Sequence, residues 1–310
     1  MKIRESAVIL FVFNRPEHTK QTLEGLKRNN VKKLHVFCDG ARTIEEKKQV
    51  EKVQKLINEV TWCEVEKEFK DINRGLANSV IEGITKVFSQ GYESVIVLED
   101  DCTPKAGFVK YMNNTLDYYK DNKKIMHVSG FGLPIKKYTD ADVFLNPYPC
   151  SWGWGTWKEE WEKCNFELYD EYNKLLLDKD LKKKFNYAGE GFSKFLNYQL
   201  EGKVNSWLIR WYYHIFVNEG LCVWSYHSLI ENKGFDGSGI HSVSRDRFNQ
   251  KSNHELNLEK FKFENDLYIN EDLNREFRRF FIGSGFMEKA KTYIYMKTGL
   301  LIERKLRPVK

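Results

Sequence analysis

Three consecutive carboxylates, Glu99, Asp100 and Asp101, are the residues of this chain whose type and spacing most directly suggest chemistry. They follow an apolar run at 94–98 and come just before Pro104. Adjacent carboxylates that lose hydration repel one another, and a bound cation holds them ionised. A hard divalent ion such as Mg²⁺ or Mn²⁺ prefers oxygen ligands of this kind and bridges to phosphates. The triplet thus predicts a divalent-cation site, although a solvated acidic loop fits the triplet alone equally well.

The elements around the triplet predict where it lies. The run at 94–98 is typical of a strand buried on both faces, and Pro104 cannot continue a strand ladder. The triplet therefore belongs at the carboxyl end of a parallel strand, where ligands bind in open α/β sheets. Strand patterns alternate with helical patterns over the first hundred residues, which predicts a mostly parallel sheet flanked by helices. The expected strands are 7–13, 34–38, 63–66 and 94–98.

Composition and missing motifs exclude several classes of protein. The chain has 310 residues, a net charge of +6 and 15% aromatic residues. This charge is too diffuse to indicate nucleic-acid binding. The turn after 7–13 lacks the glycine pattern of dinucleotide-binding folds, and no P-loop occurs. The six cysteines show no metal-ligand spacing, and no signal peptide or membrane-spanning run is visible. We expect a soluble cytoplasmic protein, at most attached to the inner face of a membrane.

The segment 148–161 alternates tryptophan with glycine. Trp152 and Trp154 are flanked by glycines, so we expect flat rings beside backbone that a ligand can approach closely. Trp157 and Trp161 are four residues apart, which predicts one face of a helix starting near Thr156, packed either in the core or near a ligand.

The later part of the chain gives weaker signals. We expect a helix at 205–216, capped at Asn205 or Ser206, and a strand at 221–224. The glycine-rich stretch 231–241 fits a lid over a site or a plain linker. The basic, aromatic segment 293–301 fits a helix on an anionic membrane surface or, more commonly, a packed terminal helix.

Taken together, the Leu98–Asp101 motif, the Gly-Trp-Gly segment and the glycine-rich stretch resemble the GT-A fold of nucleotide-sugar-dependent glycosyltransferases. The chain is similar to bacterial polysaccharide glycosyltransferases and to the N-acetylglucosaminyltransferase I family, over about 7–242. The resemblance implies a catalytic domain at 1–242, with a nucleotide-binding half at about 1–130 and an acceptor half at about 131–242. Residues 243–310 would form a small C-terminal helical extension.

The resemblance also implies roles for single residues. On the nucleotide side these are Arg15 at the donor phosphates, Asp39 at the uracil, Asn78 near the nucleotide, Glu99 and Asp100 facing the donor, and Asp101 as the direct metal ligand. On the sugar side, residues 151–155, with Trp152, Gly153 and Trp154, would line donor and acceptor. Residues 234–241, ending at His241, would order over the bound nucleotide-sugar.

One position departs from the family. The relatives place a catalytic aspartate just before a tryptophan, whereas this chain has Asn205-Ser206-Trp207 there. The nearest carboxylates in sequence are Glu201 and Glu190, which become the candidate bases.

The implied activity is a metal-dependent, inverting hexosyl or N-acetylhexosaminyl transfer from a UDP-sugar. Its acceptor would be an oligosaccharide or lipid-linked glycan of bacterial surface polysaccharide synthesis, with Mn²⁺ or Mg²⁺ as cofactor. A non-catalytic carbohydrate- or nucleotide-sugar-binding protein of the same fold is the main alternative. A sugar nucleotidyltransferase is a further one, but 12–16 is a poor match to the glycine-rich first loop that it needs.

Overall fold

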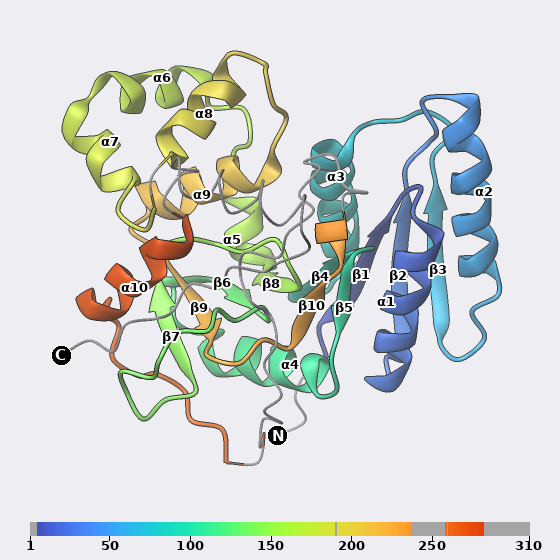
Figure 1. The fold of residues 1–310 in the computed structure, drawn as a ribbon, viewed down its shortest axis with the longest axis horizontal. Helices are drawn as coiled ribbons and strands as arrows, with labels where there is room; N and C mark the ends of the chain where they lie inside the picture. Colours follow the sequence, from blue (N-terminus) through green and yellow to red (C-terminus); the bar gives the residue numbers. More distant parts are fainter. Residues whose placement is uncertain (1–4, 190, 237–257, 259, 282–310) are drawn as a thin grey trace, which may run out of the picture.

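The computed structural model describes residues 5–189, 191–236, 258 and 260–281. Within them, eight strands form one sheet with the order β3-β2-β1-β4-β8-β6-β9-β7 (Figure 1). In chain order the strands are β1 (Ala7–Val12), β2 (Lys33–Cys38), β3 (Glu64–Phe69), β4 (Ser94–Glu99), β6 (Ile125–Ser129), β7 (Val143–Asn146), β8 (Trp154–Trp157) and β9 (Leu221–Ser225).

The sheet is mostly parallel, as the sequence predicts. Strand β1 pairs in parallel with β2 and β4, β2 with β3, and β6 with β9. Strands β7 and β8 run antiparallel to their neighbours. All side chains of β1 are buried, as are those of β4 from Val95 to Leu98. This burial explains why both strands have continuous apolar sequences and no alternation.

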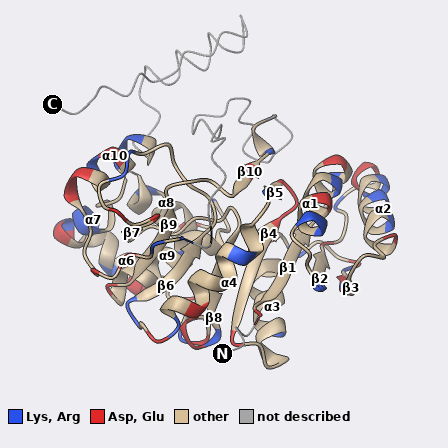
Figure 2. Cartoon of the chain, turned by 90° about the horizontal axis from the view of Figure 1, so that it is seen from below, with Lys and Arg blue, Asp and Glu red and all other residues tan. Residues whose placement is uncertain are grey.

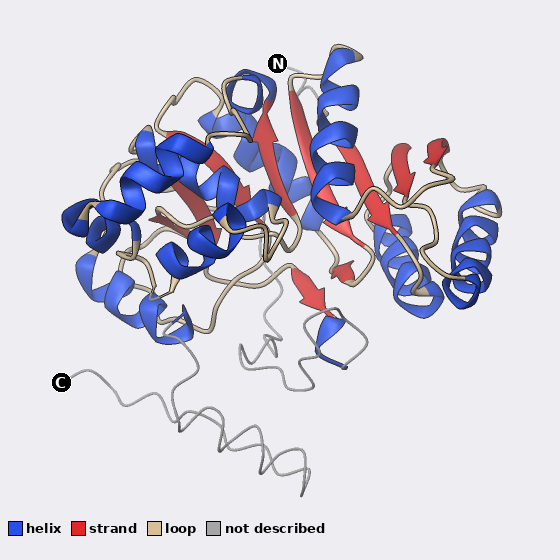
Figure 3. Cartoon of the chain, turned by 90° about the horizontal axis from the view of Figure 1, so that it is seen from above, coloured by secondary structure: helices blue, strands red, loops and turns tan. Residues whose placement is uncertain are grey.

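Helices cover both faces of the sheet (Figure 3). They are α1 (Pro16–Arg28), α2 (Ile44–Asn58), α3 (Leu76–Ser89), α4 (Phe108–Tyr119), α5 (Lys158–Glu162), α6 (Tyr169–Leu177), α7 (Lys179–Phe185), α8 (Phe192–Leu200), α9 (Trp207–Val217) and α10 (Glu271–Phe281). Helix α3 packs on β1, β2 and β4, whereas α4 packs on β4, β6 and β8. Pro16 occupies the first turn of α1, and the Thr43 side chain accepts a hydrogen bond from Glu46 N at the start of α2. Acidic and basic residues are interspersed over α1, α2 and α7 (Figure 2), in keeping with the diffuse charge of the sequence.

The region around Trp157 differs from the prediction. Residues 154–157 form strand β8, and the following helix begins only at Lys158. Strand β8 pairs with β4 on one side and with β6 on the other, and these two ladders outweigh the helical spacing of Trp157 and Trp161. The predicted cap at Thr156 is therefore wrong, whereas Ser206 caps α9 by accepting a hydrogen bond from Ile209 N.

Helix α10 packs against the far edge of the sheet. Leu273 and Phe277 are 1% and 0% exposed. The Phe277 ring meets Trp224 of β9 at 5.0 Å and Phe144 of β7 at 6.3 Å between ring centroids. Aromatic pairs at these separations add to the stability gained by apolar burial. This part of the expected C-terminal extension therefore shares the core of the sheet.

None of the helices in the described ranges is both long and apolar enough to cross a bilayer. The segment 293–301, for which a membrane-surface helix was one of two predictions, lies outside the described residues.

His127 of β6 is a fully buried histidine in the middle of this core. Its Nε2 lies 3.0 Å from Cys150 O, its Nδ1 accepts a hydrogen bond from Trp211 Nε1 at 3.3 Å, and its ring stacks on Trp154. Burial disfavours the charged imidazolium and lowers the pKa of His127 to about 3.

This lowered pKa predicts acid sensitivity. Below pH 6.5 the unfolded chain takes up a proton at His127 that the folded chain does not, so folding stability present above pH 6.5 is lost as the pH falls toward 3. Between pH 7.5 and pH 5.0 we expect this residue to account for about 2 kcal/mol of lost unfolding free energy. Urea unfolding of wild type and His127→Gln at both pH values measures the effect. Equal losses in the two proteins would contradict this assignment.

Candidate functional site

The carboxyl ends of β1, β2 and β4 lie side by side at one edge of the sheet. The parallel register places Val12 opposite Cys38 and Phe11 opposite Glu99. Arg15 and Asp39 follow the ends of β1 and β2, and the acidic triplet begins at the last residue of β4, so the fold gathers at this edge three groups to which the resemblance gives roles in donor binding. This is also the edge at which ligands bind in α/β sheets of this type.

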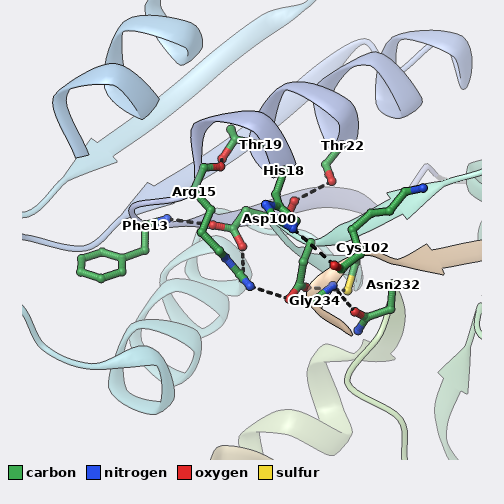
Figure 4. Close-up of polar contacts among 11 residues, drawn as sticks. Phe13, Arg15, His18, Thr19, Thr22, Asp100, Cys102, Asn232 and Gly234 are labelled. Carbon is green, nitrogen blue, oxygen red and sulfur yellow. Dashed lines mark hydrogen bonds and ion pairs between the residues drawn. The ribbon is translucent and has the colours of Figure 1, made fainter. Parts of the chain in front are cut away.

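Arg15 reaches from the start of α1 to two of the three carboxylates (Figure 4). Its Nη1 donates to Asp101 Oδ2 at 2.9 Å, and its Nη2 donates to Asp100 Oδ1. The side chains of Asp100 and Asp101 are 3% and 12% exposed. Such charge-assisted pairs are strong because little water competes for them.

The two aspartates have different surroundings. Asp100 is held on several sides: its Oδ2 accepts a hydrogen bond from Phe13 N at 3.3 Å, and its backbone oxygen accepts one from Thr22 Oγ1 at 2.8 Å. At Asp101, apart from Arg15, the side chain meets the thiol of Cys102, a weak donor, at 3.4 Å from Oδ1. Asp100 therefore ties β4 to β1 and α1. The Asp101 carboxylate has Arg15 as its one charged partner among the described residues.

The local electrostatics favour a further cation. Burial raises the pKa of Glu99, and the charges of Asp101 and Asp100 raise it further. Burial also raises the pKa of Asp100, although the Arg15 charge opposes this. Burial lowers the pKa of Arg15, but the two aspartates outweigh it and raise the pKa overall, so the guanidinium stays charged. A pKa of about 8 means that Glu99 is mostly protonated at neutral pH without a further cation, and a divalent ion bound beside it would favour its ionised form.

A two-stranded ribbon forms the next wall of the site. Strand β5 (Cys102–Pro104) pairs antiparallel with β10 (Ile230–Asn232), which continues into the 3₁₀ turn η1 (Gly234–Asp236). Lys233 N donates to Asp101 O at 2.8 Å, and Gly234 N donates to Asn232 Oδ1 at 2.8 Å. A Cβ at Gly234 would lie 2.5 Å from Asp101 Oδ2. The absence of a side chain at Gly234 thus lets the ribbon close against the Asp101 carboxylate.

Asn232 and Lys233 border the site, although the sequence did not predict a role for either residue. The only signal in the sequence is an Asn-Lys-Gly turn at the start of the glycine-rich stretch, which by itself does not say which strand it meets.

Asp39 lies at the same edge, but its carboxylate is already engaged. Its Oδ1 accepts hydrogen bonds from Gly40 N and Arg74 N, and its Oδ2 accepts one from Gly75 N at 2.8 Å. Asp39 therefore fixes the turn that leads into α3. Asn78, predicted to lie near the nucleotide, donates from Nδ2 to Arg74 O at 2.8 Å in that same first turn.

The two tryptophans of the glycine-flanked segment have different surroundings. Trp152 is half-buried, and its ring meets Phe235 of η1 edge-on at 5.6 Å. Gly153 has a φ of +61°, and a Cβ there would lie 2.4 Å from Ile230. The positive φ and the close approach both favour glycine and bring Trp152 to the ribbon that borders Asp101.

Trp154 differs from the expectation of a ligand-facing ring. It is 0% exposed and stacks between His127 and Trp207, with ring-centroid distances of 5.1 Å and 4.7 Å. Trp154 begins strand β8, which pairs with β4 and β6 inside the sheet, and its ring therefore packs in the aromatic core.

The candidate base Glu201 does not join this cluster. Glu201 follows α8 on the surface, where its carboxylate bonds to Asn197 and Lys203 of its own segment. In the segment 205–207, where the resemblance implies a carboxylate that this chain lacks, Asn205 Oδ1 accepts a hydrogen bond from Arg210 Nη2 at 2.8 Å. The other candidate base, Glu190, and the loop residue His241 lie outside the described residues.

The donor set can be tested against the cation that the sequence predicts. In the part of the chain that the structure describes, no group of three or more His, Cys, Asp or Glu side chains forms a ready-made metal centre. Asp101 nevertheless offers carboxylate oxygens with few protein partners, beside the oxygen of Asn232. This set fits an ion that takes one or two protein oxygens and completes its shell with phosphate oxygens and water, as Mg²⁺ commonly does.

Comparison with known proteins gives only distant likenesses. No protein-family model matches the sequence, and no curated protein matches it. Among solved structures, the chain is similar to a mannosyltransferase from Pyrobaculum calidifontis in complex with GDP-Man and Mn²⁺, at 12% identity and a TM-score of 0.40, over 69% of this chain and 75% of that one. Mouse xyloside xylosyltransferase 1 gives 11% identity and a TM-score of 0.37, over 69% and 82%. A cytidylyltransferase from Leptospira borgpetersenii gives 12% identity and a TM-score of 0.30, over 64% and 72%.

Proposed function

We propose that this protein is a metal-dependent glycosyltransferase that moves a sugar from a nucleoside diphosphate sugar to a hydroxyl group of a glycan acceptor. The observation that carries the proposal is the meeting of Arg15 and Asp101 at the carboxyl edge of β1 and β4. A guanidinium and a carboxylate that lacks other strong partners suit a diphosphate and its divalent counter-ion.

In this mechanism Asp101 holds the cation, and Arg15 donates hydrogen bonds to phosphate oxygens of the donor. A divalent ion, when bound, neutralises the charge that builds up on the departing diphosphate. Asp100 keeps Arg15 and the end of β4 aligned. Trp152 offers a half-buried flat face to the sugar ring, and the turn η1, which begins at Gly234 against the Asp101 carboxylate, limits access of water to Asp101.

The finer predictions remain part of the proposal. They comprise a UDP-sugar donor, an inverting outcome, a bacterial surface polysaccharide as the pathway, a lipid-linked acceptor and peripheral attachment to the membrane. Because the Asp39 carboxylate already accepts backbone hydrogen bonds, UDP and GDP are both tested below. The candidate base Glu201 binds neighbours of its own segment.

The segment 205–207 favours one second candidate function, a nucleotide-sugar-binding protein without transferase activity. The resemblance implies a catalytic aspartate in this segment, which has no carboxylate, and the Asn205 side-chain oxygen accepts a hydrogen bond from Arg210. A general base typically contributes about 10²–10⁴-fold to the rate, so its loss would leave binding intact and turnover very slow.

One pair of measurements tests the proposal and separates the two candidates. We expect UDP or GDP together with Mn²⁺ to raise the unfolding temperature, since a ligand at 100 times its dissociation constant adds about 2.7 kcal/mol. A panel of UDP- and GDP-sugars is then assayed for released nucleoside diphosphate, with oligosaccharide acceptors present. Stabilisation with release supports the transferase, whereas stabilisation without release supports the binding protein. If no nucleotide gives either stabilisation or release, both candidate functions are contradicted.

A further inference from the structure

We propose that in the ligand-free protein the Arg15 guanidinium occupies the cation position at Asp101, so that Arg15 and a divalent ion compete for this carboxylate until a diphosphate draws Arg15 away. This inference rests on the proposed function, because it concerns the same site. It adds a rule for the order of binding: the metal alone binds weakly, and metal and diphosphate bind cooperatively.

The contacts of Arg15 support the first part. Its Nη1 lies 2.9 Å from Asp101 Oδ2, at the carboxylate that has the fewest other partners. A divalent ion on that oxygen would meet the positive guanidinium at close range, in a site where water screens poorly. The Asp101 carboxylate would therefore bind a divalent ion much more weakly while the Arg15 guanidinium remains paired with Oδ2.

The backbone of Arg15 is anchored independently of its side chain. Arg15 O accepts hydrogen bonds from Thr19 N at 3.0 Å and from Thr19 Oγ1 at 2.9 Å. The side chain is 20% exposed and carries several rotatable bonds. The guanidinium can therefore leave Asp101 by a change of rotamer while α1 stays in place (Figure 4).

The two aspartates respond differently when Arg15 moves. Asp100 keeps the hydrogen bond from Phe13 N. Asp101 loses its strong partner and becomes the better cation ligand, while its backbone stays fixed by Lys233 N. A diphosphate that pairs with Arg15 thus creates a free carboxylate for the metal, and the metal favours the diphosphate by the same factor, as reciprocal coupling between two ligands requires.

The test measures Mn²⁺ binding to the full chain by the electron paramagnetic resonance signal of free Mn²⁺, with and without UDP. We expect Arg15→Gln to bind Mn²⁺ alone about tenfold or more tightly than wild type, because the competing charge is gone. UDP should enhance Mn²⁺ affinity strongly in wild type and much less in the variant. Arg15→Lys, whose single ammonium cannot bridge both aspartates, should fall between the two.

Arg275→Gln is the matched control. It removes the same charge from an exposed arginine of α10 that pairs with Asp272, and it should leave both affinities unchanged. Thermal unfolding in EDTA confirms that each variant folds, and Mn²⁺ should raise the midpoint of Arg15→Gln more than that of wild type.

The outcomes separate the two proposals. Equal or weaker binding of Mn²⁺ alone by Arg15→Gln, with cooperative Mn²⁺ and UDP binding in wild type, would overturn the competition and leave the proposed function standing. Tighter Mn²⁺ binding by the variant, together with no turnover of any nucleotide-sugar by wild type, would support the competition and count against the transferase. No Mn²⁺ binding by any of the proteins would overturn both.

Discussion

Asp101→Asn should weaken Mn²⁺-dependent nucleotide binding about 100-fold or more. The change keeps the size of the side chain but removes the charge that holds the cation, and loss of a direct metal ligand costs at least as much as the 10–100-fold typical of outer-shell partners. The contact from Arg15 Nη1 loses its ionic character at the same time. Isothermal titration calorimetry with UDP in the presence of Mn²⁺ measures the affinity.

Two comparisons make the Asp101 result specific. Asp117→Asn removes a carboxylate of α4 that pairs with Lys120 on the surface, and it should bind as wild type does. Asp100→Asn should mainly lower folding stability, because Asp100 ties Phe13 N and Arg15 to the end of β4. An unchanged affinity in Asp101→Asn would remove Asp101 as the metal ligand.

Trp154→Ala should lower the unfolding free energy by about 3–5 kcal/mol, the cost typical of removing a large buried aromatic side chain. Trp154 is 0% exposed and stacks between His127 and Trp207, so the cavity would open in the middle of the core. Chemical denaturation at pH 7.5 measures the loss.

Trp152→Ala is the matched partner of this experiment. Its ring is half-buried at the ribbon, so we expect a loss below about 1 kcal/mol, as for ordinary partly exposed positions, together with a raised KM for the donor. Wild-type stability in Trp154→Ala would mean that the stack contributes little, and an unaltered KM in Trp152→Ala would exclude a sugar contact there.

The first half of the fold was predictable because its signals are local. The apolar runs of β1 and β4 are buried on both faces, and Pro16 starts α1 in the structure as it does in the sequence. Parallel pairing then brings the strand ends to one edge, where Arg15 meets the acidic triplet; the role of Arg15 itself came only from the resemblance. The helix predicted near Thr156 failed because pairing with β4 and β6, a long-range effect, overrides side-chain spacing.

The wall of the site formed by β5 and β10 could not be predicted from the sequence, because it also depends on long-range pairing. Contact of Gly234 with Asp101 depends on pairing between β5 and β10, which are far apart along the chain. Likewise, the glycines beside Trp152 and Trp154 suggest open backbone at both rings. Trp154 is buried because it starts strand β8 inside the sheet, whereas Trp152 lies before the strand, across the positive-φ turn at Gly153.

Helix α10 packs on β7 and β9, so the protein cannot be shortened to residues 1–242 without exposing part of its core. A version shortened at residue 242 would uncover Trp224 and Phe144, whose rings are sheltered by Phe277. An apolar surface of that kind promotes self-association and poor recovery on expression. Any shortened form intended for crystallisation or screening should therefore retain the chain through Phe281.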